Sequence, residues 1–149
     1  MNLVFVNSTK KAMPKKQAQL VLQELQKALP KARKNLEKQI TIVFLNTAKA
    51  RALNHQYRQK DYATDVLSFD AGTPEELGEL IMCPQVLKRQ AKENHHSFRA
   101  EFTYMFLHGV LHLLGYGHEG ESPKNKRDAQ KMFRIQDELF HSLQKRNML

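Results

Sequence analysis

The chain has 149 residues, a formal net charge of +9 and one cysteine, Cys83. A length of 149 residues is ordinary for one domain, so we expect a single domain over residues 1–149. No apolar run is long enough to cross a bilayer, and the N-terminus lacks the charged start and cleavage site of a signal peptide. One cysteine cannot form a disulfide within the chain, so we expect a cytoplasmic protein with no membrane and no disulfide-linked partner.

In the first 60 residues, two strand patterns are each followed by a helical pattern. The predicted strands are residues 3–6 and 40–45, and the predicted helices are residues 14–29 and 47–58. Pro14 suits the first turn of a helix, and Pro30 ends the apolar spacing of that helix. Asn46 or Thr47 can cap the second helix. This part of the chain therefore predicts two strand–helix units.

Two strand patterns and three helical patterns follow. The predicted strands are residues 65–69 and 80–82, and the predicted helices begin near residues 84, 97 and 123. Gly72, Thr73, Pro74 and Gly78 supply turn chemistry, which favours a hairpin between the two strands. In the last helix, the residues expected to face inward are Ala129, Met132, Phe133, Gln136, Leu139 and Phe140. The sequence predicts an α+β fold, with a small mixed sheet of about four strands packed against about five helices.

Three of the seven histidines lie within eleven residues, as His108, His112 and His118. On a helix, positions 108 and 112 share a face, so both imidazoles can point to one spot. Gly115 can adopt the left-handed conformation that ends a helix, which lets the chain turn back with His118. Three neutral nitrogens with an open fourth position are typical of a catalytic zinc. The sequence predicts a zincin-like site for one zinc ion, with nickel or another divalent ion left open.

One position separates this run from the metzincin peptidase pattern H-E-x-x-H-x-x-G-x-x-H. Those peptidases place a glutamate there as the general base, and this chain has Gly109. The metal ligands of a zinc peptidase are thus predicted without its base, so peptide hydrolysis by that route is not expected.

The alternative to a metal site is a buried helix. Residues 104–114 are apolar nearly all round, which is how a core helix looks, and a single histidine there is more often a hydrogen-bonded core residue. Burying three imidazoles without a shared partner costs desolvation energy that an apolar core avoids. The spacing of the three histidines therefore favours the metal.

The positive charge is concentrated in the first 60 residues. They hold 13 Lys and Arg against two acids, a balance of +11, whereas the other 89 residues have a balance of −2. A lopsided positive field attracts polyanions, of which nucleic acid is the commonest. A solvated face that only keeps the protein soluble is the alternative.

A second dense stretch runs from Leu53 to Phe69 and reads L-N-x-x-Y-R-x-K-D-x-x-T-D-V-L-S-F. Some forty residues later the chain reads H-G-x-L-H-L-x-G-Y-x-H. These two motifs, in this order, resemble the YbeY family of endoribonucleases and ribosomal RNA maturation factors, and the resemblance covers most of residues 40–140.

The resemblance implies a single-strand-specific, metal-dependent endoribonuclease that acts in late 16S rRNA 3′-end maturation and in ribosome quality control. Its implied partners are the ribosomal RNA precursor and the small ribosomal subunit. By position, the metal ligands fall on His108, His112 and His118, and the functional arginine falls on Arg58.

Two positions depart from the family pattern. Gly117 and Glu79 stand where the family usually has aspartate. With Gly117, the hydrogen-bond acceptor that the family has beside the third ligand is missing. We expect this loss to affect the properties of the bound metal rather than its binding.

As a mechanism, we expect zinc to lower the pKa of a water toward about 7, so that no protein base is needed. Arg58 would hold the phosphate with two hydrogen bonds as negative charge builds. We therefore assign catalytic roles to Arg58 and, through the metal, to His108. RNA contacts are assigned to Arg58, Lys60 and His55. An ordinary surface arginine is the alternative for Arg58.

Other polar residues are weaker candidates. Asp65 and Glu119 can orient a water, but a turn-capping aspartate and a solvated glutamate are the simpler interpretations. His95 and His96 are expected at a helix–helix junction, in solvent. Ser68 has no activating base visible in the sequence, so it is not expected to be a nucleophile.

Three aromatic residues, Tyr57, Tyr62 and Phe69, can stack on unpaired bases. Core packing is the alternative for Tyr57 and Phe69.

Two functions compete with the RNA hydrolase. One is a zinc peptidase. The other is a ribosome assembly factor that binds RNA and whose metal serves structure alone, although structural zinc sites are usually four-coordinate and rich in cysteine.

Overall fold

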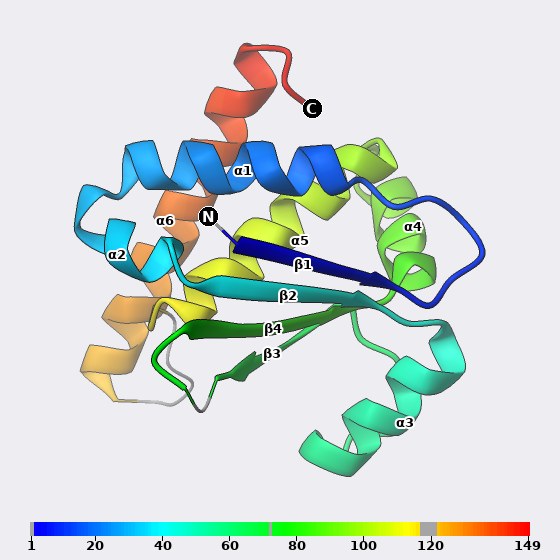
Figure 1. The fold of residues 1–149 in the computed structure, drawn as a ribbon. Helices are drawn as coiled ribbons and strands as arrows, with labels where there is room; N and C mark the ends of the chain where they lie inside the picture. The colour runs from blue at the N-terminus through cyan, green and yellow to red at the C-terminus, as the bar shows by residue number, and fades with distance from the viewer. Residues whose placement is uncertain (1, 72, 117–121) are drawn as a thin grey trace.

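The computed structural model describes residues 2–71, 73–116 and 122–149 (Figure 1). In chain order its elements are β1 (Asn2–Asn7), α1 (Lys15–Ala28), the 3₁₀ turn η1 (Pro30–Ala32), α2 (Arg33–Leu36), β2 (Gln39–Phe44), α3 (Thr47–Arg58), β3 (Val66–Asp70), β4 (Glu76–Met82), α4 (Pro84–Glu93), α5 (Phe98–Leu113) and α6 (Pro123–Lys145).

The four strands form one mixed sheet in the order β1-β2-β4-β3. The strands β1, β2 and β4 are parallel, and β3 runs antiparallel to β4, which confirms the predicted hairpin. Gly78 was expected in the turn of that hairpin, but it lies within β4. A Cβ at Gly78 would lie 2.5 Å from the carbonyl oxygen of Phe69 and 2.6 Å from Cδ2 of Leu113. The glycine is therefore required by close packing within the sheet and against α5.

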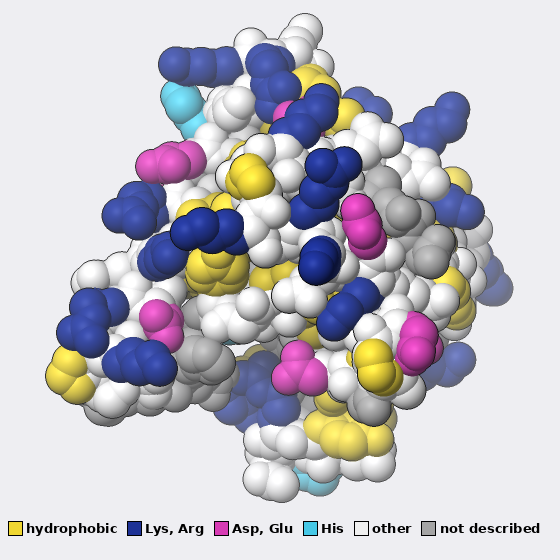
Figure 2. Space-filling view, turned by 60° about the vertical axis from the view of Figure 1, so that its left-hand side comes forward, with side chains coloured by type: hydrophobic (Ala, Val, Ile, Leu, Met, Phe, Trp, Pro, Cys, Tyr) yellow, Lys and Arg dark blue, Asp and Glu magenta, His cyan; other side chains and the backbone are white. Residues whose placement is uncertain are grey.

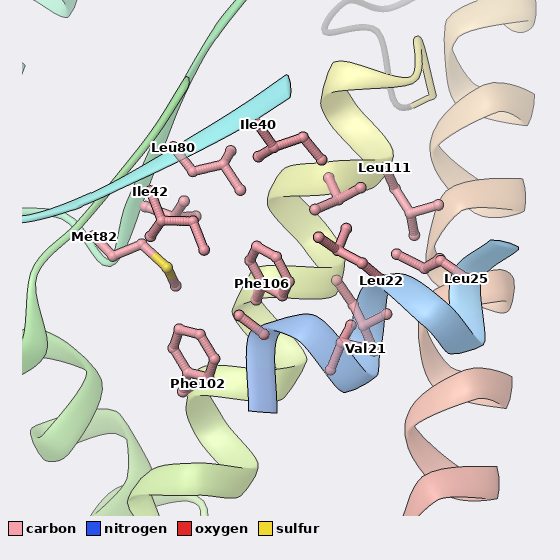
Figure 3. Packing of buried hydrophobic residues seen from close by; sticks show 14 of the residues in the cluster. Val21, Leu22, Leu25, Ile40, Ile42, Leu80, Met82, Phe102, Phe106 and Leu111 are labelled. Carbon is pink, nitrogen blue, oxygen red and sulfur yellow. The ribbon is translucent and has the colours of Figure 1, made fainter. Parts of the chain in front are cut away.

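Four helices, α1, α4, α5 and α6, lie on one side of the sheet, and α3 lies on the other (Figure 1). The core forms where side chains of the sheet meet α5 and α1 (Figure 3). Its central members are Ile40, Ile42, Leu80 and Met82 from the sheet, Phe102, Phe106 and Leu111 from α5, and Val21, Leu22 and Leu25 from α1. Full burial of each such side chain stabilises the fold by about 1.5–3 kcal/mol.

The helix α5 is central because it contacts β3, β4, α1, α4 and α6. Contacts on every side explain why residues 104–114 are apolar nearly all round. The alternative interpretation of this stretch as a core helix is thus correct for its environment. It does not decide what the two histidines on it do.

The predicted α+β class and the four strands are confirmed. The described residues contain six α-helices rather than five, because α2 has only four residues and no repeating apolar pattern to reveal it. Asn46 and Ser97 cap α3 and α5 as predicted, accepting from the backbone nitrogens of Lys49 and Ala100. Phe133 was expected to face inward, but it is 47% exposed. No helix in the described part of the chain is long and apolar enough to cross a membrane.

Candidate functional site

His108 and His112 lie one turn apart near the C-terminal end of α5 and face each other. Their Nε2 atoms are 3.1 Å apart, and their rings meet nearly edge to face, with an interplanar angle of 75°. Both side chains are partly buried. The helix therefore brings two imidazole nitrogens to one point, as the spacing predicted.

Gln136, fully buried on α6, fixes the ring of His108. Its Nε2 donates to the backbone oxygen of Tyr104 at 3.0 Å, and its Oε1 lies 3.2 Å from Nδ1 of His108. A carbonyl oxygen only accepts, so the amide nitrogen must face Tyr104 and the amide oxygen must face the histidine. Nδ1 of His108 therefore donates, and its Nε2 keeps a lone pair directed at His112.

Gly115 ends α5 as predicted, in the left-handed region at φ 95°. The backbone nitrogen of Gly115 donates to the oxygen of His112, and that of Tyr116 donates to the oxygen of Leu111, each at 3.0 Å. This is the Schellman pattern, which reverses the chain direction after a helix. The predicted third ligand, His118, lies outside the described residues, as do Gly117 and Glu119.

The histidine pair fits a tetrahedral metal ion. Two nitrogens bound to one zinc at about 2.0–2.1 Å lie about 3.3 Å apart, close to the 3.1 Å between the two Nε2 atoms. Across residues 2–71, 73–116 and 122–149, no group of three His, Cys, Asp or Glu side chains is placed to hold a metal ion. The three-histidine zinc site therefore stays a prediction, of which the structure describes two members.

Gly109, the position of the peptidase base, is buried against the sheet rather than directed at the histidine pair. A Cβ there would lie 2.8 Å from Cδ2 of Leu80 and 3.3 Å from Cγ2 of Val66. A glutamate side chain would have to enter this packed contact between α5 and the sheet. The glycine is thus explained by packing, and this site has no room for the peptidase base.

A cleft of about 600 Å³, here called the histidine cleft, contains the pair. It is lined by Tyr57, Arg58, Thr64, Asp65, Val66, Leu67, Ser68, Phe69, Asp70, His108, His112, Gly115 and Tyr116. These residues come from the end of α3, the loop after it, β3 and the end of α5. The two motifs that are forty residues apart in the sequence thus form the walls of one cleft.

Arg58 is the last residue of α3, and two contacts hold the loop that follows it. Arg51 forms two hydrogen bonds to Asp61, at 2.8 and 2.9 Å, and these lower the pKa of the Asp61 carboxyl. Asn54, fully buried, donates to the backbone oxygen of Tyr62 at 2.8 Å. The loop therefore returns to β3 along a defined path, with Arg58 at the mouth of the cleft.

Not every predicted contact residue lines the cleft. His55 and Lys60 are exposed and lie outside its lining, as does Tyr62. Tyr57 and Phe69 both line it, and their rings meet edge to face with centroids 5.3 Å apart. Tyr57 is 56% exposed, so it lines the cleft rather than filling the core.

Both carboxylate oxygens of Asp65 accept hydrogen bonds at the start of β3. Its Oδ1 accepts from the backbone nitrogen of Val66 at 2.7 Å, and its Oδ2 accepts from Gln90 at 3.2 Å. His95 and His96 lie between α4 and α5, as predicted. His95 is exposed, whereas His96 is only partly exposed and its Nδ1 lies 3.2 Å from the buried carboxyl of Glu101, so the expectation of solvent was wrong for His96.

Asp70, Thr64 and Tyr116 line the cleft although the sequence did not predict them as cleft residues, and the link from Gln136 to His108 was not predicted either. A polar residue inside the apolar stripe of the last helix was the available signal for Gln136, since buried amides nearly always have partners. Nothing in the sequence marks Asp70, which joins the cleft only because β3 lies beside α5.

The side of the molecule that carries α2 and the start of α6 is rich in Lys and Arg (Figure 2). The exposed Lys31, Arg33 and Lys34 of η1 and α2 belong to the basic part of the sequence. In Figure 1 the C-terminal end of α5, with the histidine pair, points to this same side. A positive field on this side of the molecule favours a polyanion as the ligand.

Comparison with known proteins gives a consistent result. The model of the family described as endoribonuclease YbeY matches residues 4–144. A Bdellovibrio bacteriovorus protein named endoribonuclease YbeY is 45% identical over 150 residues, covering 98% of this chain and 97% of that protein. A Pseudomonas putida protein of the same name is 39% identical over 116 residues, covering 74% of this chain and 71% of the relative. The solution structure of a Thermotoga maritima protein shares the fold, with a TM-score of 0.59 and 24% identity over 97% of this chain and 93% of that one.

Proposed function

The chain belongs to the endoribonuclease YbeY family and is an endoribonuclease, and from this premise we propose that it cuts single-stranded RNA in the histidine cleft with the help of a metal ion. We propose the 3′ end of the 16S rRNA precursor as its substrate, the small ribosomal subunit as its partner and the cytoplasm as its location. A role in ribosome quality control is part of the same proposal.

The observation that carries this proposal is that Arg58 and the histidine pair line one cleft. Phosphoryl transfer needs a group that positions the phosphate and a group that stabilises the charge on it. The two motifs place a guanidinium and two imidazoles around a space of about 600 Å³, which is large enough for a nucleotide.

We propose that His108, His112 and His118 hold the metal ion, zinc or nickel. When bound, the ion would act as a Lewis acid on the phosphoryl oxygens and would acidify a water at neutral pH. Gln136 contributes by keeping Nδ1 of His108 protonated, so that Nε2 is the nitrogen offered to the ion.

Arg58 is proposed to bind the phosphate oxygens in a bidentate contact, with two hydrogen bonds from its guanidinium. Its place on the last turn of α3, beside the fixed loop, lets it point at the phosphate without first ordering a segment of chain. The ring of Tyr57 packs edge to face against Phe69 and offers a surface on which an unpaired base can stack. Stacking accepts any base and requires an unpaired strand, which supports single-strand specificity.

The test is cleavage of an end-labelled 16S rRNA precursor by protein whose metal content has been measured, with His108→Ala alongside. We expect the wild type to cut within unpaired RNA and His108→Ala to lose both the metal and at least 100-fold of the rate. Equal cutting by both would show that another site or a contaminant is responsible. If neither cuts but both bind RNA, the protein is an RNA-binding assembly factor.

A further inference from the structure

A second cavity of about 600 Å³ lies at the opposite end of α3 from Arg58. We call it the lysine cavity; it is lined by Ser8, Thr9, Lys10, Lys11, Ala12, Met13, Asn46, Pro84, Gln85, Lys88 and Phe98. Its lining includes residues that directly follow the parallel strands β1, β2 and β4, beyond their carboxyl ends. Figure 1 shows these strand ends on the right-hand side of the sheet. Ligands of parallel sheets commonly bind at this edge.

The ionisable side chains that line this cavity are all positive. Lys10, Lys11 and Lys88 are exposed at its rim, and its lining contains no aspartate or glutamate. Among the residues that the structure describes, none of the three lysines forms an ion pair. Three ammonium groups therefore face solvent around one hollow with no counter-charge in its wall.

The helices around the cavity add to this field. α1, α3 and α4 follow β1, β2 and β4, so they all begin at this edge of the sheet, and none has an acidic residue in its first turn. Acidic residues commonly occupy first turns, because they offset the positive end of the helix dipole. Without such acidic residues, the positive ends of the three helix dipoles add to the positive charge of the lysines.

The floor of the cavity is apolar. Met13 and Phe98 are partly buried there, whereas the lysines lie at the rim. A ligand with a flat apolar body and a phosphate matches both parts, since a base packs against apolar side chains and a phosphate pairs with lysines.

We propose that the lysine cavity binds an unpaired nucleotide of the substrate RNA, away from the bond that is cut. This inference rests on the proposed function for the identity of the ligand. Asn46, the cap of α3, lines the lysine cavity, and Arg58, its last residue, lines the histidine cleft. The helix between them is roughly 18 Å long, which corresponds to about five stacked nucleotides. One strand could therefore occupy both sites.

The experiment measures binding of a fluorescent 20-nucleotide unpaired RNA made resistant to cleavage by 2′-O-methyl groups and phosphorothioate linkages. The test variant is Lys10→Glu/Lys88→Glu, and the matched control is Lys92→Glu/Lys145→Glu. The control changes the net charge equally, at exposed positions that do not line the cavity. Thermal melting checks that both variants are folded.

We expect the test variant to bind the 20-mer at least tenfold more weakly than the control does. The slope of log affinity against log salt should become shallower by about 1.4, for two lost phosphate contacts. A four-nucleotide probe is too short to reach both sites, so the loss of affinity from control to test variant should be smaller for this probe than for the 20-mer.

Three results would overturn the inference: equal losses in test and control variants, no binding of the 20-mer by the wild type, or binding of 5′-AMP as tight as that of the 20-mer. The last result would indicate a site for free nucleotides. A wild type that binds in this way but cuts no RNA would overturn the proposed function and leave the lysine cavity as an RNA site.

Discussion

The side-chain amide of Gln136 bridges His108 to the backbone oxygen of Tyr104, four residues earlier on the same helix. Both of its polar atoms are used, and the residue is fully buried on α6. The hydroxyl of Tyr104 also donates to Asp137 of α6 at 2.7 Å, and burial together with this bond raises the pKa of Tyr104 to about 12. The orientation of His108 is thus determined by α6, a helix that begins after the histidine run.

Replacing Gln136 should weaken metal binding. In Gln136→Leu nothing accepts the Nδ1–H of His108, so we expect the zinc affinity to fall 10- to 100-fold, measured by competition with a chromophoric chelator. Gln136→Glu keeps an acceptor for His108 and should recover most of that loss.

Met132→Ala is the control for this experiment. Met132 is also buried on α6, and its truncation should cost about 2–5 kcal/mol of stability without removing a hydrogen bond to His108. A zinc affinity that falls equally in Met132→Ala and Gln136→Leu would mean that loss of packing, not of orientation, is responsible.

Arg58 should be needed for the rate of cleavage more than for the fold. Arg58→Ala should lower kcat by about 100- to 1000-fold, as when a donor to a transition-state oxygen is removed. Arg58→Lys should recover little, because an ammonium does not reproduce the bidentate contact. Arg58 is exposed at the end of α3, so Tm should be nearly unchanged. Single-turnover cleavage measures the effect. If Arg58→Ala cuts as fast as the wild type, Arg58 is an ordinary surface residue with no role in cleavage.

Alanine at Gly109 and alanine at Gly115 should each lower the stability of the fold, but for different reasons. Gly109→Ala places a methyl group 2.8 Å from Leu80, so overpacking should cost about 1–3 kcal/mol. Gly115→Ala has no atom within 4 Å of the new methyl group, and its cost of about 1 kcal/mol should come from the positive φ alone. Urea unfolding measures both. A Gly109→Ala protein as stable as the wild type would mean that α5 can move away from the sheet.

The sequence predicted the elements that have a period or a cap of their own. The strand 40–45, the helix capped by Asn46 and the hairpin after Asp65 were all predicted because alternation, capping and turn chemistry are local properties. The helix α2 was missed because four residues carry no period, and Gly78 was placed in the turn because a glycine required by packing looks the same as one required by a turn.

The site was predictable as two motifs but not as one cleft. The spacing of His108 and His112 indicates a shared face, yet nothing local shows that Arg58 lies beside them. That juxtaposition depends on β3, the edge strand next to β4, which packs against α5 and contributes Phe69 and Asp70 to the same cleft. Residues such as Gln136 act across two helices that no sequence period connects.

Acid should weaken the attachment of the end of α6 to α1. Arg146 donates to the buried Glu24 at 2.9 Å, and this bond holds the pKa of Glu24 below its usual value of 4.5. A carboxyl whose pKa is lower in the folded state stabilises the protein above its unfolded pKa and loses that contribution as the pH falls through the folded pKa.

Glu24→Gln should therefore be less stable than the wild type at pH 7, by about 1 kcal/mol because Arg146 is half-exposed and screened by solvent. Below pH 4.5 the difference should shrink, since a protonated Glu24 resembles glutamine. Urea unfolding of both proteins between pH 7 and pH 3 measures it. A difference that stays constant over this range would mean that Glu24 contributes by packing and neutral hydrogen bonding rather than by its charge.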